Sequence, residues 1–221
     1  SSYNPIFKAD RIFSIIHEEF FPDMSGSDWE TKLHDSLCCV GLNPEHVLNK
    51  YPHQLSGGQL QRFLIARALL LETDFIVADE IISMLDASTR IDVLNLLAEL
   101  KSCGFSVLFI THDLSLGYYI SERAVILYRG CVVEMGKTDL IFNNPIHPYT
   151  RALMSSVPRL DKHWEEGGGG DLCTRESLGI QKGCSYYGRC KSAIPDLCEC
   201  IEPKLVEVED DHFVACHLNN E

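Results

Sequence analysis

Leu55-Ser56-Gly57-Gly58-Gln59 stands at the start of an apolar run that continues to Leu71. Two adjacent glycines after a serine let the backbone approach an anion closely, and Ser56 can cap a helix over residues 59–71. The first turn of such a helix carries unpaired amides and the positive end of the helix dipole, so it suits the terminal phosphate of a nucleotide. Taken alone, a serine and two glycines before a helix usually form no more than a cap.

Two apolar segments farther along the chain each lead to polar residues. Phe75-Ile76-Val77-Ala78 precedes Asp79 and Glu80, and Val107-Leu108-Phe109-Ile110-Thr111 precedes His112. Short apolar runs of this kind predict buried parallel strands. We therefore expect His112 to lie beside the two carboxylates at the ends of the strands, where Asp79 can hold Mg²⁺ and Glu80 can polarise a water molecule.

The order of these motifs resembles that of ABC-type ATPases. As in that family, the chain has an LSGGQ signature and then a strand ending in Asp-Glu. The segment Ser83-Met84-Leu85-Asp86 and a strand ending in Thr-His-Asp come next. In the family, two ATPase subunits meet head to tail and enclose ATP between them. The resemblance implies that the nucleotide is bound by the following residues: Ser56, Gly57, Gly58, Gln59, Asp79 and Asp86.

The same resemblance implies a role for each residue. The signature would grip the γ-phosphate of ATP held by the opposite subunit, and Asp79 would position Mg²⁺ through water. Glu80 and His112 would be catalytic, Glu80 as general base on the attacking water and His112 as the group that steadies water and γ-phosphate together. Asp86 would cross the dimer interface. The family usually has Pro-Thr-Ser or Pro-Ser-Ser after the glutamate, whereas Ile81-Ile82-Ser83 stands here, and a turn without proline allows Glu80 to shift.

A segment around residue 147 resembles one branch of the ABC family in particular. Asn144-Pro145-Ile146-His147-Pro148-Tyr149-Thr150-Arg151-Ala152-Leu153 is similar to the His-Pro-Tyr segment of ABC importers for oligopeptides, dipeptides or nickel. Pro148 suits the first turn of a helix. The resemblance implies an ATP-hydrolysing importer subunit for peptides, nickel or metal chelates, whose cargo is chosen outside this chain. It also implies a place at the cytoplasmic face of the cell membrane and these partners: a second ATPase subunit, two transmembrane permease subunits and an extracytoplasmic substrate-binding protein.

The last quarter of the chain is crowded with cysteines. In a chain that looks cytosolic, such crowding points to a metal site rather than to disulfides. Four of these residues resemble the cysteines that hold a 4Fe–4S cluster in the same importer ATPases: Cys184, Cys190, Cys198 and Cys216. Four thiolates would equally satisfy a tetrahedral zinc ion, and the spacing does not separate the two. Cys200 could replace Cys198 as a ligand, and Cys173 is a more distant candidate. The alternative is that these cysteines bind nothing and are simply buried thiols.

The pattern along the chain predicts an α/β fold: a partial P-loop NTPase-like ABC ATPase core with parallel strands, a helical subdomain and a small cysteine-rich extension. Apolar stripes predict core helices over about 9–21 and 27–40, and Arg129-Gly130 between two apolar runs predicts a hairpin. The expected domains are a helical subdomain over 1–54, the C-terminal half of the ATPase core over 55–160, a flexible linker over 161–182 and the tail over 183–221.

No Gly-x-x-x-x-Gly-Lys-Ser/Thr sequence occurs in the chain. That loop and its lysine hold the β- and γ-phosphates in the resembled ATPases. The chain therefore resembles the carboxyl-terminal portion of a longer enzyme, and we expect it to be inactive alone. Three explanations stay open: an incomplete gene, a first half removed or encoded apart, and a degenerate subunit that lends only its signature to a partner.

Charge and hydropathy limit the other classes of function. The balance of 19 basic against 32 acidic residues gives a net charge of −13, which opposes a nucleic-acid footprint and disfavours an ABC ATPase that works on DNA. No window approaches the ~20 consecutive apolar residues that span a bilayer, so any membrane role would come through partner subunits. The competing hypothesis is a non-catalytic regulatory or iron–sulfur binding module in which the cysteine tail is the active feature.

Overall fold

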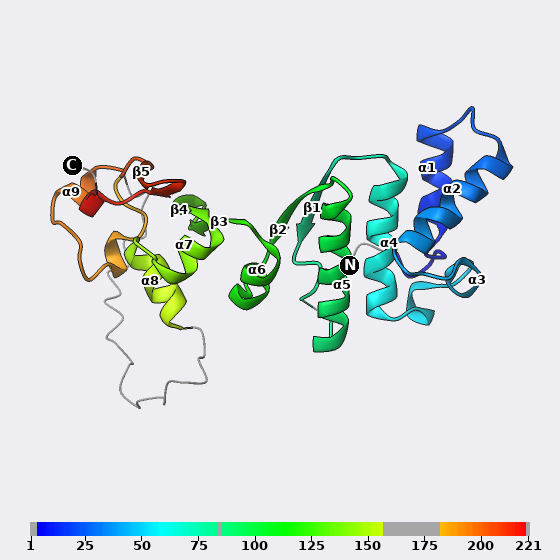
Figure 1. Cartoon of the computed structure of the whole chain (residues 1–221), viewed down its shortest axis with the longest axis horizontal. Coiled ribbons are helices and arrows are strands. Elements are labelled where there is room, and N and C mark those ends of the chain that lie inside the picture. The colour runs from blue at the N-terminus through cyan, green and yellow to red at the C-terminus, as the bar shows by residue number, and fades with distance from the viewer. Residues whose placement is uncertain (1–3, 84, 157–181, 220–221) are drawn as a thin grey trace. The chain divides into compact units, whose positions relative to one another are not determined.

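The computed structural model describes residues 4–83, 85–156 and 182–219 (Figure 1). They belong to two compact units, Ser1–His112 and Asp113–Glu221. The expected linker, with its four glycines and Cys173, lies outside the described residues except at position 182. The domain boundaries expected at residues 54, 160 and 182 therefore remain predictions. No helix in the described parts of the chain combines the length and the apolar character needed to cross a bilayer.

The first unit begins with three helices, α1 (Arg11–Phe20), α2 (Gly26–Cys39) and α3 (Pro44–Val47). Ser25 caps α2 by accepting the backbone N–H of Asp28, and α2 packs against α4 (Gly57–Leu70). The apolar stripe expected on the core side of α1, which includes Ile16 and Phe20, is only partly right. Phe13 and Ile16 are buried, whereas Phe20 is 64% exposed. The Phe13 ring stacks on Phe63 of α4 at a centroid distance of 5.2 Å, so the buried face of α1 is rotated relative to the expected one.

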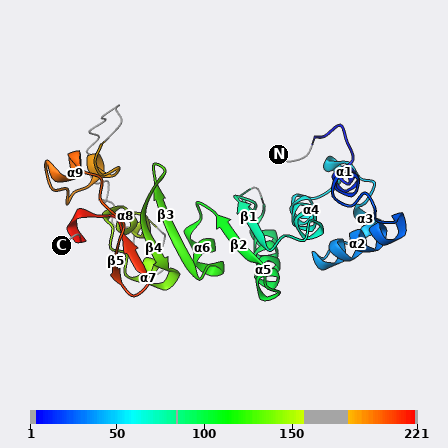
Figure 2. The same ribbon diagram turned by 90° about the horizontal axis from the view of Figure 1, so that it is seen from above.

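A two-stranded parallel sheet follows in the same unit. Strand β1 (Phe75–Asp79) pairs with β2 (Ser106–Ile110), and α5 (Ala87–Ser102) connects them and packs against β2 (Figures 1 and 2). The parallel pairing confirms the predicted arrangement, but the expected burial on both faces is wrong. Ile76 and Ala78 are buried, whereas Val77 and Leu108 are 55% and 46% exposed. One apolar face of the sheet is open because, among the described residues, the helices of this unit cover only the other.

The second unit is built on a four-stranded antiparallel sheet in the order β3-β4-β6-β5. Its elements are α6 (Leu114–Ile120), β3 (Arg123–Tyr128), β4 (Cys131–Lys137), α7 (Thr138–Asn143), α8 (Pro148–Ser155), α9 (Leu197–Cys200), β5 (Val206–Glu209) and β6 (His212–Val214). Arg129 and Gly130 both have positive φ, at 49° and 81°, as a tight two-residue hairpin requires. The hairpin predicted from the sequence is therefore confirmed.

The cysteine-rich tail contributes β5 and β6 to this sheet, which the sequence did not indicate. Strand β6 pairs with β4 from Glu134↔Val214 to Gly136↔His212. A Cβ at Gly136 would lie 2.4 Å from the carbonyl oxygen of Asp211, so this glycine permits the close approach of the two strands. The core beneath the sheet combines Ile126, Tyr128, Val133, Ile141 and Met154.

Candidate functional site

The signature forms the N-terminus of α4 as the sequence predicted. The Ser56 Oγ accepts the backbone N–H of Gln59 at 3.2 Å, and the Gln59 Oε1 accepts the backbone N–H of Ser56 at 2.9 Å. This reciprocal pair satisfies two groups that would otherwise lack partners at the helix start. The other amides of the first turn are the donors that an anion would use.

The two signature glycines also have a packing role, which sequence reasoning missed. A Cβ at Gly58 would lie 2.5 Å from the Thr89 Cγ2 atom, and one at Gly57 would lie 3.1 Å from a Leu85 methyl group. A side chain at Gly58 would force the signature or Thr89 to move, whereas one at Gly57 would require the Leu85 methyl group to give way slightly. Glycine is therefore needed here for close packing as well as for any approach of an anion.

Asp86 is the N-cap of α5. Its Oδ1 atom accepts the Ser88 hydroxyl at 2.6 Å and the Thr89 backbone N–H at 3.0 Å, while its Oδ2 accepts the Thr89 hydroxyl at 2.8 Å. These hydrogen bonds, led by that from Ser88, hold the pKa of Asp86 well below its usual range. Asp86 is thus an exposed carboxylate in a fixed orientation beside the signature.

The structure brings Glu80 and His112 together at the ends of the parallel strands. The Glu80 backbone N–H donates to the carbonyl of Ile110 at 3.0 Å, and the His112 Nδ1 lies 3.0 Å from the Glu80 Oε1. The side chains of both residues are exposed, His112 at 74% and Glu80 at 52%. Asp79 is the last residue of β1 and is also exposed. The carboxylates and the imidazole therefore share one accessible edge of the sheet.

The turn after Glu80 is restrained by side chains in place of proline. Glu80 has a φ of +46°, which is an uncommon conformation for a residue with a side chain. The backbone N–H and hydroxyl of Ser83 both donate to the Glu80 carbonyl, at 3.1 and 2.9 Å. Arg90 donates from Nε to the Leu85 carbonyl at 2.7 Å and from Nη2 to the Ser83 carbonyl at 3.3 Å. Sequence reasoning did not single out Arg90, because its partners are backbone atoms.

The four predicted cysteine ligands lie close together in the second unit. Cys184, Cys198 and Cys216 are buried and Cys190 is half-buried, and all four are free thiols. Burial raises the pKa of Cys184, Cys190 and Cys216, and repulsion among the four cysteine sulfurs raises it further. Neighbouring cysteine sulfurs thus lie near enough to Cys184, Cys190 and Cys216 to disfavour the ionisation of these three thiols.

Backbone N–H groups surround these sulfurs. Ile194 donates to the Cys198 Sγ at 3.3 Å. The backbone N–H groups of Tyr186, Ser192 and Leu218 partly offset the rise in the pKa of Cys184, Cys190 and Cys216. Amide donors favour the thiolate form, which is the form that binds metals.

By donor type alone, four clustered cysteines suit a positively charged group bound through sulfur. Such a group would relieve both the burial of the thiolates and their mutual repulsion. No three His, Cys, Asp or Glu side chains in the described ranges are arranged to enclose a single metal ion. Cys198 is buried whereas Cys200 is exposed, which favours Cys198 as the fourth ligand.

Gly183 is a further determinant of this cysteine site. A Cβ at this position would lie 2.4 Å from the carbonyl oxygens of Cys198 and Glu199. The absence of a side chain lets the Cys184 backbone N–H reach the Cys198 carbonyl at 2.8 Å. A glycine directly before a cysteine is the sequence signal for this contact.

The His-Pro-Tyr segment forms α8, with His147 as its N-cap. The His147 Nδ1 accepts the backbone N–H of Tyr149 at 3.0 Å, and Pro148 occupies the first helical position. The His147 side chain is 1% exposed, and burial lowers its pKa to about 4. The imidazole is therefore neutral near pH 7 and can act as the acceptor that the helix start requires.

Comparison with known proteins shows similarity to ABC transporter ATPases in both units of the chain. A family model for ABC transporters matches residues 8–83, and a model for the C-terminal region of oligopeptide/dipeptide transporters matches residues 133–198. The dimeric structure of a bacterial ABC transporter cassette superposes with a TM-score of 0.53 at 31% identity, covering 62% of this chain and 59% of that chain. A post-hydrolysis state of the same cassette with ADP and Pi gives the same values.

Two curated relatives extend the similarity to nearly the whole chain. The oligopeptide transport ATP-binding protein OppF of Escherichia coli is 39% identical over 98% of this chain, which spans 65% of the length of OppF. The dipeptide transport ATP-binding protein DppD of Caldanaerobacter subterraneus is 36% identical over 100% of this chain and 68% of its own length. The chain thus covers about two thirds of each relative. It belongs to the family of ABC transporter ATP-binding proteins, in the oligopeptide and dipeptide branch.

Proposed function

We propose that this chain carries the signature and catalytic-carboxylate part of an ATP-hydrolysing importer subunit. The observation that supports this most is the 3.0 Å approach of the His112 Nδ1 to the Glu80 Oε1 at the ends of two parallel strands. General-base chemistry on a water molecule needs a carboxylate in a fixed position at an accessible edge. The names of the relatives favour peptides as cargo, with nickel or metal chelates as the alternative.

In the proposed mechanism, each motif acts on ATP held by another phosphate loop. The first-turn amides of α4, with Ser56 and Gln59, would bind the γ-phosphate. Glu80 would take a proton from the attacking water, and His112 would hold that water and the γ-phosphate in line. Asp79 would hold Mg²⁺ through water, and the ion would neutralise charge developing on the phosphates. The fixed carboxylate of Asp86 would contact the opposite ATPase subunit.

We infer that the phosphate-loop half lies on polypeptide outside these residues. Parallel sheets are found almost only with both faces covered, yet Phe75, Val77, Leu108 and Ile110 expose one face of the β1–β2 sheet. In the described part of the chain, β2 pairs only with β1 and β3 only with β4. Additional strands beside β2 and β3 would satisfy these open edges.

ATP hydrolysis tests both inferences. The isolated chain should show negligible turnover, and turnover should appear when a phosphate-loop half is supplied, either joined upstream or as a separate polypeptide. Glu80→Gln should then abolish hydrolysis, whereas Glu99→Gln, at an exposed position on α5, should not. Robust turnover by the isolated chain would refute the inferred division. Restored turnover that survives Glu80→Gln would refute the role of Glu80.

We further propose that the complete protein works at the cytoplasmic face of the membrane. Its partners would be a second ATPase subunit, two transmembrane permease subunits and an extracytoplasmic substrate-binding protein. Family membership and the dimeric cassette among the similar structures support this assembly. Co-purification of permease subunits with the complete ATPase from solubilised membranes is the expected result.

We propose that Cys184, Cys190, Cys198 and Cys216 hold a 4Fe–4S cluster, with zinc as the alternative. The bound group would join segments that are distant in the sequence, so its first role would be structural. A brown protein with about four irons per chain supports the cluster. Colourless protein with one zinc supports the alternative, and metal-free protein refutes both. Cys200→Ser should leave the metal content unchanged, whereas Cys198→Ser should remove it.

If a supplied phosphate-loop half fails to restore hydrolysis while the cysteine site retains its metal, the chain is better described as a non-catalytic regulatory or iron–sulfur binding module. The four-cysteine site, in which Cys184, Cys198 and Cys216 are buried, is the observation that favours this second candidate.

A further inference from the structure

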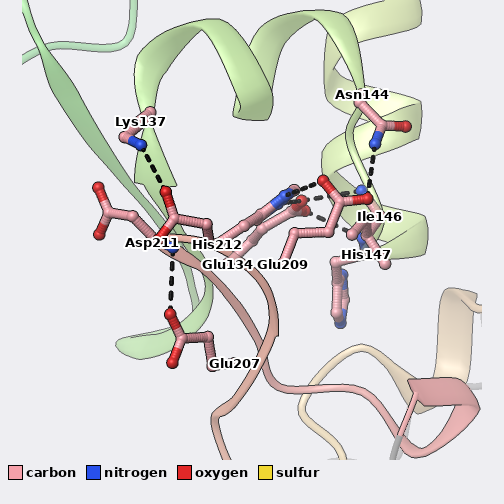
Figure 3. A network of polar contacts seen from close by, with 10 residues as sticks. Glu134, Lys137, Asn144, Ile146, His147, Glu207, Glu209, Asp211 and His212 are labelled. Carbon is pink, nitrogen blue, oxygen red and sulfur yellow. Dashed lines mark hydrogen bonds and ion pairs between the residues drawn. The ribbon is translucent and has the colours of Figure 1, made fainter.

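A fully buried carboxylate organises the second unit. Glu134 of β4 is 0% exposed although it carries an ionisable carboxyl group. Its Oε1 accepts the backbone N–H of Ile146 at 2.8 Å and its Oε2 accepts that of His147 at 3.0 Å (Figure 3). These two amides directly precede α8. Glu134 therefore fixes the start of the His-Pro-Tyr helix.

The third partner of Glu134 comes from the cysteine-rich tail. His212 of β6 is also 0% exposed, and its Nε2 lies 2.8 Å from the Glu134 Oε1. Its Nδ1 has no hydrogen-bond partner among the described residues and lies 3.9 Å from a Glu209 carboxylate oxygen. Figure 3 shows His212, Glu134 and Glu209 close together in this network. A buried carboxylate is costly to leave unpaired, so the seating of α8 depends on the position of β6.

Short connections join this network to the cysteine site at two points. Cys216 lies two residues after Val214, which is opposite Glu134 in the β4–β6 pairing, and the intervening Ala215 donates its N–H to the Val133 carbonyl at 2.9 Å. Cys184 lies two residues before Tyr186. The Tyr186 ring packs on Tyr128 of β3, Tyr149 of α8 and the His147 imidazole, with centroid distances of 5.1, 5.4 and 5.9 Å.

We propose that the four-cysteine site and the start of α8 form one conformational unit, in which His212 and Glu134 transmit the state of the cysteines to the His-Pro-Tyr helix. When the cysteines lose their bound group, β6 and the segment around Tyr186 lose an anchor. The His212–Glu134 contact then weakens, and the amides of Ile146 and His147 open. This inference rests on the proposed metal or cluster at the four cysteines.

Amide hydrogen exchange of the 221-residue chain tests the coupling. The exchange of the Ile146 and His147 amides would be measured by NMR in the protein as purified and after removal of its metal by a chelator under reducing conditions. We expect removal to speed exchange of both amides about tenfold or more, because local opening exposes them. Amides in α4 and α5 of the first unit should not change.

Two substitutions of His212 and one control distinguish the proposed coupling from a general loss of stability in the second unit. His212→Leu should speed exchange of the two amides with metal still bound, and chelation should then add little. His212→Gln keeps a side-chain donor for Glu134 and should retain most of the response. Asp210→Asn, which alters an exposed ion pair with Lys137 on the same hairpin, should behave as the unaltered chain does.

The outcomes distinguish this proposal from the one on which it rests. If chelation speeds exchange in residues 183–200 but leaves the Ile146 and His147 amides unchanged, the coupling is refuted and the cysteine site stands. If no metal is bound, or if its removal changes neither segment, both proposals fail. An equal response in the His212→Leu variant and the unaltered chain also refutes transmission through His212.

Discussion

Replacement of Gly58 by alanine should destabilise the first unit through one contact. The added Cβ would lie 2.5 Å from the Thr89 Cγ2, closer than real Cβ atoms approach. Thr89 has little freedom to rotate, since its hydroxyl and backbone N–H both donate to Asp86. Relief of the clash must therefore either weaken the cap of α5 or move the signature away from it.

The expected change in the free energy of unfolding for Gly58→Ala is the sum of two opposing contributions. Alanine in a helix is favoured over glycine by ~0.5–1 kcal/mol, and overpacking of a rigid site costs about 1–3 kcal/mol. The net loss should be about 1–2 kcal/mol in the free energy of unfolding. Gly26→Ala is the matched control, because a Cβ there meets nothing within 4 Å. That variant should be unchanged or stabilised by up to about 1 kcal/mol.

A double-mutant cycle with Thr89→Ser assigns the effect to the proposed contact. Serine lacks the Cγ2 methyl group but keeps the hydroxyl that binds Asp86, so Gly58→Ala should cost little in that background. Urea unfolding followed by the fluorescence of Trp29, in a Trp164→Phe background, reports on the first unit. A coupling energy of about 1 kcal/mol or more is expected. If Gly58→Ala costs nothing, or costs the same with serine at position 89, the packing argument is wrong.

Three other predictions follow from the described contacts. Burial lowers the pKa of His147 to about 4, so the unfolded chain binds a proton at a pH where the folded chain does not. The free energy of unfolding of the second unit should thus be highest above pH ~6.5 and fall by about 3 kcal/mol towards pH 4. Urea unfolding at several pH values would detect this loss. His147→Asn keeps an acceptor at the helix cap and should make the stability depend less on pH. Gly183→Ala should separate Cys184 from Cys198 and lower the metal content of purified protein. A metal content equal to that of the unaltered chain would show that the close contact at Gly183 is not needed for the cysteine site. Val77→Ser should change the stability of the isolated chain by less than about 0.5 kcal/mol because the side chain is exposed, but cost about 1–3 kcal/mol once a phosphate-loop half covers the sheet.

Local chemistry accounts for the parts of the molecule that the sequence predicted. The Ser56 cap depends on residues three positions apart, and the Arg129-Gly130 hairpin depends on two residues that adopt positive φ. The parallel pairing that places His112 beside Glu80 follows from two apolar runs of similar length. These features need no knowledge of the rest of the fold.

The features that sequence reasoning missed depend on distant partners. Glu134 and His212 are 78 residues apart, and neither stands in a motif that requires the other. Gly183 and Gly136 are needed because of carbonyl groups brought near them by other segments. The exposed face of the β1–β2 sheet was missed for another reason: an apolar run indicates that a strand is suited to burial, not that the chain supplies the cover.

The two units depart from ordinary burial in opposite ways, and each departure has a physical implication. The first unit leaves apolar strand residues such as Val77 and Leu108 exposed, which costs solvation free energy that a covering layer would recover. The second unit buries Glu134 and His212, which costs desolvation free energy that an apolar pair of similar size would avoid. Neither arrangement is what stability alone would favour. An exposed apolar face calls for further polypeptide, and a buried ionisable pair is best justified when it fixes the relative positions of separate segments. The same reasoning supports both proposals: a phosphate-loop half that covers the sheet of the first unit, and a coupling in the second unit between the four cysteines and the start of α8.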